Sequence, residues 1–274
     1  MLSVNTNAGA LIALENLNNT SQQLQKAQQV VSTGLAVSSA QDNGAIWAIA
    51  QNERATNSSL DAVKSSLQTG QSILDVANSA GSTVSDLLSQ MKEKALAASD
   101  TSIDSNSRAA LNSDFIALRN QITTTIQNAD FNGVNMLNGS VAKITSLANA
   151  DGTSVLTTLA QNMSLGGSIV TVGSAGSIGT VTTATTMIAT VGTSLTAVDN
   201  ALATLGTSAG ALQTHLSFIS NLQDTLTVGI GNLVNADLAK ESATLQALQT
   251  KQQLGIQALS IANSSSSALL GLFR

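Results

Sequence analysis

The chain has 274 residues, a formal net charge of −5 and only 10% charged residues, with neither cysteine nor proline and a single histidine. The lack of cysteine excludes disulfide scaffolds and thiol catalysis, and one histidine argues against a histidine-ligated metal. The scattered basic residues leave no footprint for nucleic acid. We therefore expect no enzyme activity, no catalytic residue, no metal, no cofactor and no nucleic-acid partner.

The start of the chain, Met1 to Asn7, lacks a basic segment ahead of an apolar stretch, and no run of about 18 apolar residues occurs. Neither a cleavable signal peptide nor a membrane partner is expected. The residues that follow predict an amphipathic helix over 3–33, because apolar residues recur mostly at steps of three and four. Its other side carries asparagine and glutamine, and Gly34 is typical of a helix C-terminus.

A heptad pattern from Ile46 to Ala98 predicts one long helix. Such a helix is about 80 Å long, whereas a globule of this chain length has a diameter of roughly 50 Å. The pattern therefore predicts an elongated rod. Residues 99–106 predict a turn with capping aspartates, and a third heptad helix is expected from Leu111 to Ala129.

The stretch 139–186 has a different character, since it holds only two charged residues and alternates valine and threonine with glycine. Alternation of this kind, including residues 165–173, predicts short strands, with glycines at turns or bulges. The Asn-Gly pairs at 132–133 and 138–139 predict tight turns just before it. We expect a small β-rich insert here.

Heptads resume at Ile188 and lose their phase around Ile230, beside Gly229 and Gly231. We expect the rod to end there and a separate terminal helix to follow. The whole pattern predicts a mainly α fold, an elongated heptad helical rod with a small β-rich insert and paired N- and C-terminal helices. The expected parts are a terminal polymerisation domain (1–43 and 232–274), a rod domain (44–138 and 187–231) and the insert (139–186).

The terminal helices have an apolar stripe but only each other to pack on, and an isolated helical pair is marginally stable. We infer that they find further partners in other copies of the chain. The residues expected to mediate this self-association are Leu11, Leu14, Leu17, Leu24, Val31, Leu245, Leu248, Leu259, Leu269 and Leu270.

Several stretches of the chain resemble bacterial flagellins. The segment from Val31 to Ala45 is similar to the family's Leu-Ser-Ser-Gly-Leu-Arg-Ile-Asn-Ser-Ala-Lys-Asp-Asp-Ala-Ala, although Ala36 replaces the arginine. The other matching stretches are Val4–Asn7 at the opening, Phe131–Val134 in the Phe-Asn-Gly turn, Leu259–Asn263 in the last helix and Leu269–Arg274 at the end. The resemblance covers roughly 1–140 and 185–274.

The resemblance implies a structural subunit that polymerises into the flagellar filament for swimming motility, with terminal helices that order on assembly. It implies a secreted, extracellular homopolymer whose partners are the flagellar export apparatus, a flagellin chaperone, and hook-junction and cap proteins. The alternatives are a flagellar junction or cap-like protein and a secreted coiled-coil binding protein. The motif around Gly34 and the short insert favour the filament subunit.

The insert is rich in hydroxyl side chains, which have two interpretations. One is ordinary strand and turn chemistry. The other is O-glycosylation of an exposed face, which the resemblance to flagellins implies. The candidate acceptors are Ser168, Thr171, Ser174, Ser177, Thr182 and Thr183.

Overall fold

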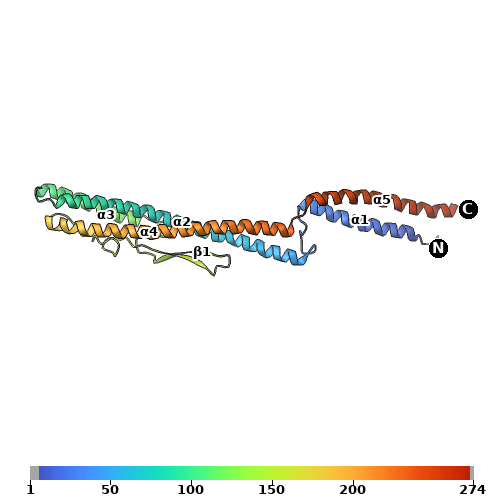
Figure 1. The fold of residues 1–274 in the computed structure, drawn as a ribbon, viewed down its shortest axis with the longest axis horizontal. Coiled ribbons are helices and arrows are strands. Elements are labelled where there is room, and N and C mark those ends of the chain that lie inside the picture. Colours follow the sequence, from blue (N-terminus) through green and yellow to red (C-terminus); the bar gives the residue numbers. More distant parts are fainter. Residues whose placement is uncertain (1–5, 272–274) are drawn as a thin grey trace. The chain divides into compact units, whose positions relative to one another are not determined.

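The computed structural model describes residues 6–271, and their side chains as far as Ser264. This part of the chain contains the helices α1 (Ala8–Thr33), α2 (Gly44–Ala98), α3 (Ser105–Gln127), α4 (Val181–Val234) and α5 (Leu238–Gly271) (Figure 1). The strands β1 (Lys143–Leu147) and β2 (Val155–Leu159) pair in an antiparallel hairpin. The prediction of a mainly α fold with a small β element is confirmed.

The ends of the helices follow from local chemistry. The side chain of Asn7 accepts a hydrogen bond from the Ala10 amide at the start of α1, and Gly34 ends this helix in the left-handed conformation with φ 72°. Asp104 caps α3 by accepting from the Ser107 amide at 2.9 Å. Helix α2 runs for 55 residues without interruption, which the absence of proline permits.

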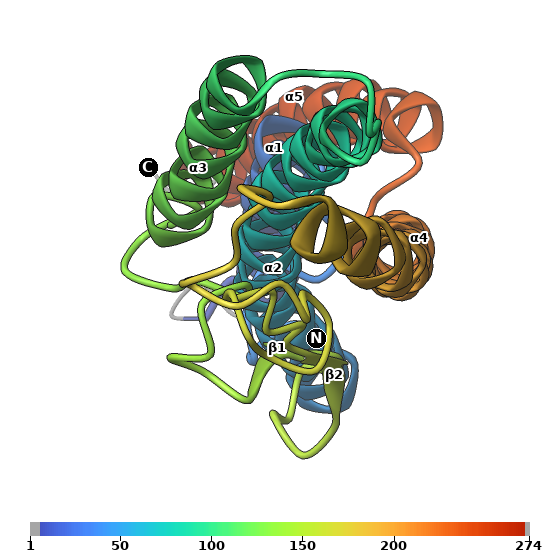
Figure 2. The same ribbon diagram turned by 90° about the vertical axis from the view of Figure 1, so that its left-hand side faces the viewer.

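The chain groups into two compact units, Met1–Ala55 with Thr225–Arg274, and Thr56–Asp224. In the second unit, α2, α3 and α4 run side by side as a three-helix bundle (Figure 2). Large side chains between them are fully buried, among them Leu67, Leu74, Leu88, Met91, Phe115 and Ile122. Polar contacts tie the helices at their margins, such as the ion pair of Lys94 Nζ with Asp114 Oδ2 at 2.9 Å.

Hydrogen bonds join the segment of the β1–β2 hairpin to both long helices of the second unit, α2 and α4. The Leu147 amide donates to Ser66 Oγ of α2 at 3.0 Å, and His215 Nε2 of α4 bonds the Ala148 carbonyl at 2.8 Å. The single histidine therefore has a structural role in holding the hairpin.

The expectation of strands at residues 165–173 is wrong, because these described residues form an irregular segment. Gly166 has φ 74°, which a strand does not accommodate. Val170 and Val172 are fully buried beside the bundle, and the Thr171 amide donates to Ser194 Oγ of α4 at 3.0 Å. Burial of the valines and bonding to a helix replace pairing with another strand. Helix α4 then begins at Val181, earlier than the expected end of the insert at 186.

The expected end of the long helix at Gly229 and Gly231 is also wrong, since α4 continues to Val234. Two glycines cost a helix about 1 kcal/mol each, which neighbouring packing offsets. After α4 ends at Val234, Asp237 caps the start of α5. Its Oδ1 accepts a hydrogen bond from the Lys240 amide at 3.1 Å. A side-chain cap, and not the phase of the heptads, fixes the boundary.

Within the first unit, the linker between α1 and α2 is hydrogen-bonded to the chain at the junction of α4 and α5. The Ala36 amide donates to the Val234 carbonyl at 2.7 Å, the Ala236 amide donates to the Gly34 carbonyl at 2.9 Å, and Leu35 forms a bridge with Asn235. A small core lies beside them, made of Val37, Ala50, Ile230 and Val234, with Leu35, Ile46 and Trp47 packed against it.

Asp42 organises the loop between α1 and α2. Its Oδ2 accepts four hydrogen bonds, from the amide and the hydroxyl of both Ser38 and Ser39, at 3.0–3.2 Å. Lys26 Nζ lies 3.7 Å from its other oxygen. The hydroxyl of Ser38, followed by the two backbone amides, holds the pKa of Asp42 below its ordinary value.

Candidate self-association surface

Helices α1 and α5 pack antiparallel along one seam. Near the ends of the chain, Asn7 Nδ2 donates to the Ala262 carbonyl at 2.8 Å. Further along, Leu17 lies over Gly255, where an added methyl group would stand 3.2 Å from Leu17 Cδ1. Gln252 Nε2 then donates to Ser21 Oγ at 3.4 Å. For two residues that face each other across the seam, the residue numbers therefore add up to about 271.

Burial along this seam is one-sided and shallow. Helix α1 buries four side chains, Thr20, Leu24, Ala27 and Val30. In α5, none of the side chains described between residues 238 and 264 is buried, because each is at least partly exposed to solvent. The described part of α5 therefore carries apolar side chains that its neighbours within the chain leave partly uncovered.

Most of the residues expected to mediate self-association lie on the intrachain seam. Leu24 is buried there, and Leu17, Val31, Leu245, Leu248 and Leu259 are half-buried. Leu11 and Leu14 are exposed, with 60% and 43% of their surface accessible. Leu269 and Leu270 lie in α5, and their side chains are outside the described residues. Within the chain, most of these residues contact the partner helix of the pair, and their part in association between copies stays a prediction.

Five exposed apolar side chains of these helices are not among the residues expected to mediate self-association: Ile12, Leu238, Leu254, Ile256 and Ile261. Leu238 lies on the heptad pattern, whereas the other four fall between its positions. The signal that could have found them is the run from Leu254 to Ala262, which is apolar on several sides of the helix.

The exposed apolar side chains of the pair concentrate where the helices near the chain ends, a region we call the tip (residues 7–15 and 251–262). Beyond it, the exposed side of α1 is made largely of asparagine and glutamine. The tip also holds an open groove of about 410 Å³, lined by Thr6, Asn7, Ala10, Leu11, Leu14, Leu259 and Asn263. The tip is therefore the most incompletely covered part of this unit.

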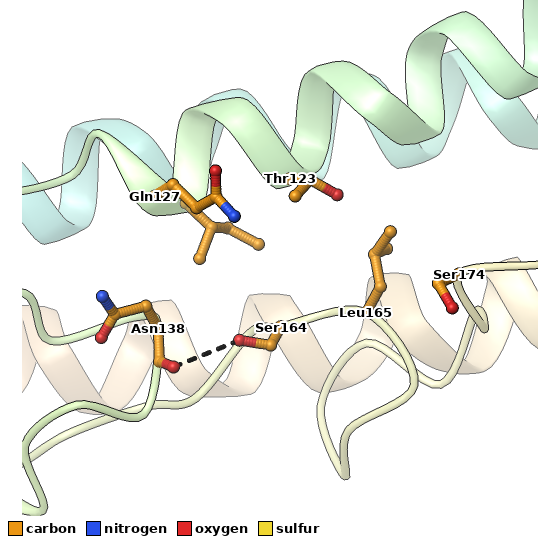
Figure 3. A pocket seen from close by; sticks show the side chains of 7 residues that line it. Thr123, Gln127, Asn138, Ser164, Leu165 and Ser174 are labelled. Carbon is orange, nitrogen blue, oxygen red and sulfur yellow. Dashed lines mark hydrogen bonds between the residues drawn. The ribbon is translucent and has the colours of Figure 1, made fainter.

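The second unit has a larger cleft, of about 450 Å³, between α3 and the irregular segment (Figure 3). Amide and hydroxyl side chains line much of it, and Ser164 Oγ donates to the Asn138 carbonyl across its rim at 3.4 Å. No charged residue lines it, and the described residues contain no group of three histidines or carboxylates able to hold a metal. The cleft offers no group suited to acid–base or nucleophilic chemistry.

The hydroxyl candidates for glycosylation fall into two groups. Thr171 Oγ1 donates to the Thr190 carbonyl at 3.3 Å, and Thr183 Oγ1 donates to the Thr180 carbonyl at 3.0 Å. Ser168, Ser174 and Thr182 are exposed, and Ser177 is half-buried. The first two hydroxyls therefore have partners within the fold, although Thr171 and Thr183 are exposed as well.

Helix α4 is long and apolar enough to cross a membrane by length and composition, with a mean hydropathy of 1.2 over its best window of 18 residues. The sequence argument did not find this window. Core helices meet the same two criteria, so the match is weak evidence for a membrane partner.

Comparison with known proteins places this geometry in a family. A profile of the bacterial flagellin N-terminal helical region matches residues 4–142, and a profile of the C-terminal helical region matches residues 188–273. The chain belongs to the bacterial flagellins. It is therefore a structural subunit of the flagellar filament, which lies outside the cell, and it polymerises with copies of itself.

Full-length relatives agree with this assignment. Flagellin FljO of Caulobacter vibrioides is 58% identical over 272 residues, which is 99% of this chain and 98% of that protein. Flagellin FljN of the same organism is 59% identical over the same shares. A flagellin of Brucella melitensis is 35% identical over 283 residues, the whole of both chains.

Solved structures support the fold of this flagellin. A Bacillus cereus flagellin is 22% identical with a TM-score of 0.50, and the match covers 55% of this chain and 86% of that one. A putative flagellar hook-associated protein from Vibrio parahaemolyticus is 13% identical with a TM-score of 0.59, over 71% of this chain and 100% of that one.

Proposed function

We propose that α1 and α5 form the surface through which copies of this flagellin associate, and that the exposed apolar side chains of the tip are buried only in the filament. The observation that carries this proposal is that none of the described side chains of α5 is buried. Leu254 and Ile261 expose 58% and 68% of their surface. Burying such side chains against other copies favours assembly by the hydrophobic effect.

We further infer that the two helices gain order on assembly. A helical pair with one shallow seam is marginal in water, and contacts with additional helices supply the missing burial. Ordering is then coupled to binding, so that the chain stiffens where it joins the polymer. The residues proposed for this terminal domain are 1–43 and 232–274, with 44–138 and 187–231 as the rod domain and 139–186 as its insert.

We also propose that this flagellin is secreted through the flagellar export apparatus, with a chaperone before export and junction and cap proteins at the filament ends, and that its filament drives swimming. The absence of cysteine and proline suits a chain that crosses a narrow channel unfolded, since neither disulfide exchange nor proline isomerisation delays its folding.

The test is seeded assembly of purified chain, followed by light scattering and electron microscopy. Leu254→Asp and Ile261→Asp place a charge on the exposed apolar surface, and we expect both to abolish filaments while the helix content of the monomer is unchanged. Gln246→Asp adds the same charge to an exposed polar position of α5 outside the tip and serves as the matched control. Filaments of normal length from Leu254→Asp would contradict the proposal.

A further inference from the structure

The tip carries two exposed stripes of similar design. On α1, the stripe consists of Ala8, Leu11, Ile12 and Glu15, and on α5 it consists of Lys251, Leu254, Ala258 and Ile261. All eight side chains are exposed. Each stripe is an apolar run that ends, on the side away from the chain ends, in one charged residue, and the two charges have opposite sign.

Glu15 and Lys251 do not pair within the chain. The ion pairs among the described residues are Lys26 with Asp42 and Lys94 with Asp114. The antiparallel register of the seam explains this, because Glu15 lies level with Ile256 and Lys251 lies level with Thr20. The two charges are therefore offset by five residues along the pair, which is about 8 Å at 1.5 Å per residue.

We propose that the α1 stripe of one copy packs on the α5 stripe of the next copy, with Glu15 of the first beside Lys251 of the second. This inference rests on the proposed function, in which the tip is the association surface, and it names the pairing. The two copies stand parallel and are displaced by about 8 Å along the helix axes. With this displacement, Ile12 of one copy faces Leu254 of the other, and Ala8 faces Ala258.

Chemistry favours this pairing over stripe-on-identical-stripe contacts. Between copies that stand parallel and level, two α1 stripes in contact would bring two Glu15 carboxylates together, and two α5 stripes would bring two Lys251 ammonium groups together. Contact between unlike stripes matches opposite charges and joins two apolar runs. Such a contact also leaves one stripe free at each end of a row of copies, so that growth continues.

The positions of the two stripes around their helices determine how successive copies are arranged in space. At 100° per residue, the α1 stripe lies on the side of the helix opposite the seam, whereas the α5 stripe lies about 110° around from it. Successive copies therefore do not lie in one plane, and the row curves. Curvature combined with an axial step at each contact gives a helical path and not a closed ring.

The direct test uses the unmodified chain. Filaments grown from an equal mixture of ¹⁵N-labelled and unlabelled chain are treated with a zero-length carbodiimide, which joins a carboxylate to an amine in contact with it. We expect an amide between Glu15 and Lys251 that links labelled to unlabelled peptides, in filaments and not in monomers. A Glu15 linked to another lysine, linked only within single chains, or not linked at all would overturn the pairing.

Charge reversal gives a second, independent test. Glu15→Lys and Lys251→Glu each place like charges in contact, and we expect each to raise the monomer concentration needed for assembly by roughly three- to tenfold. The variant with both reversals restores opposite charges at every contact and should assemble like the unmodified chain. Lys240→Glu, an exposed position of α5 outside the tip, is the control for a change of net charge.

The two proposals fail in different ways. If Leu254→Asp blocks assembly but the double reversal does not rescue the single ones, the tip is the association surface and the stripe pairing is wrong. If Leu254→Asp assembles normally, the association surface lies elsewhere and both proposals fall.

Discussion

Helices α2 and α5 carry the same kind of heptad pattern, yet they differ in what they bury. Along α2, the seam residues Leu60, Leu67, Leu74 and Leu88 are almost completely buried, because other elements of the second unit cover the helix. Along α5, no described side chain is buried. A heptad pattern therefore reports the presence of a seam and says little about how many partner helices surround it.

The largest expected difference between these helices is in amide hydrogen exchange of the monomer. Protection scales with the free energy of local opening, which rises with buried contacts. We expect amides of residues 240–262 to exchange roughly a hundredfold or more faster than those of residues 67–91. In filaments this difference should shrink. Equal protection of the two helices in the monomer would show that the single seam suffices to hold α5.

A core substitution sharpens the same comparison. Phe115 is fully buried in the bundle, and Phe115→Ala should lower the free energy of unfolding of the second unit by about 3–5 kcal/mol. Leu259 is half-buried on the seam, and Leu259→Ala should cost the monomer about 1 kcal/mol. Urea titrations followed by circular dichroism measure both. Similar losses for the two variants would mean that the seam is as well packed as the bundle.

Two glycines of the bundle give a smaller effect with opposite signs. A methyl group at Gly81 would stand 2.6 Å from Leu202 Cδ2, so Gly81→Ala should lose about 1 kcal/mol after its gain in helix propensity. No atom lies within 4 Å of the corresponding position at Gly206, and Gly206→Ala should gain up to about 1 kcal/mol. Thermal unfolding of the two variants checks the signs, and a gain at Gly81 would contradict the close packing of α2 on α4.

The smallest expected effect concerns the loop at Asp42. Because its pKa is lowered in the folded chain, the carboxylate stabilises the loop above its unfolded pKa and loses this effect as the pH falls through the folded pKa. Asp42→Asn should therefore speed exchange of the Ser38 and Ser39 amides at neutral pH. At a pH below the lowered pKa of Asp42 the variant and the parent should converge, because the parent is then protonated too. A difference that persists in acid would point to packing as its cause.

Much of the helical framework could be predicted from residue patterns. The heptads located α2 within two residues at its start, and Gly34 marked the end of α1 because only glycine enters the left-handed conformation without strain. An aspartate cap was expected within 99–106 for a similarly local reason, and Asp104 supplies it, although α3 starts at Ser105 and not at Leu111. These features depend on a few neighbouring residues, which a sequence displays directly.

The remaining features depend on contacts between distant residues. Val170 and Val172 alternate with polar residues as a strand would, but they are buried beside α4. Gly229 and Gly231 lie inside a helix that Asp237 ends several residues later. Most exposed apolar side chains of the tip were not predicted, because a heptad pattern identifies the stripe that packs within the chain. The stripes left over become visible only when the seam is known.

The double linker of the first unit has a mechanical consequence. The Ala36 amide donates to the Val234 carbonyl, and the Ala236 amide donates to the Gly34 carbonyl. The chain therefore enters and leaves the α1–α5 pair through two segments that are hydrogen-bonded to each other. A single strand would act as a swivel, about which the pair could turn freely. Two strands joined side by side resist torsion, because rotation must first break the hydrogen bonds between them. In a filament subunit, this joint passes torque from the terminal pair into α2 and α4 instead of dissipating it.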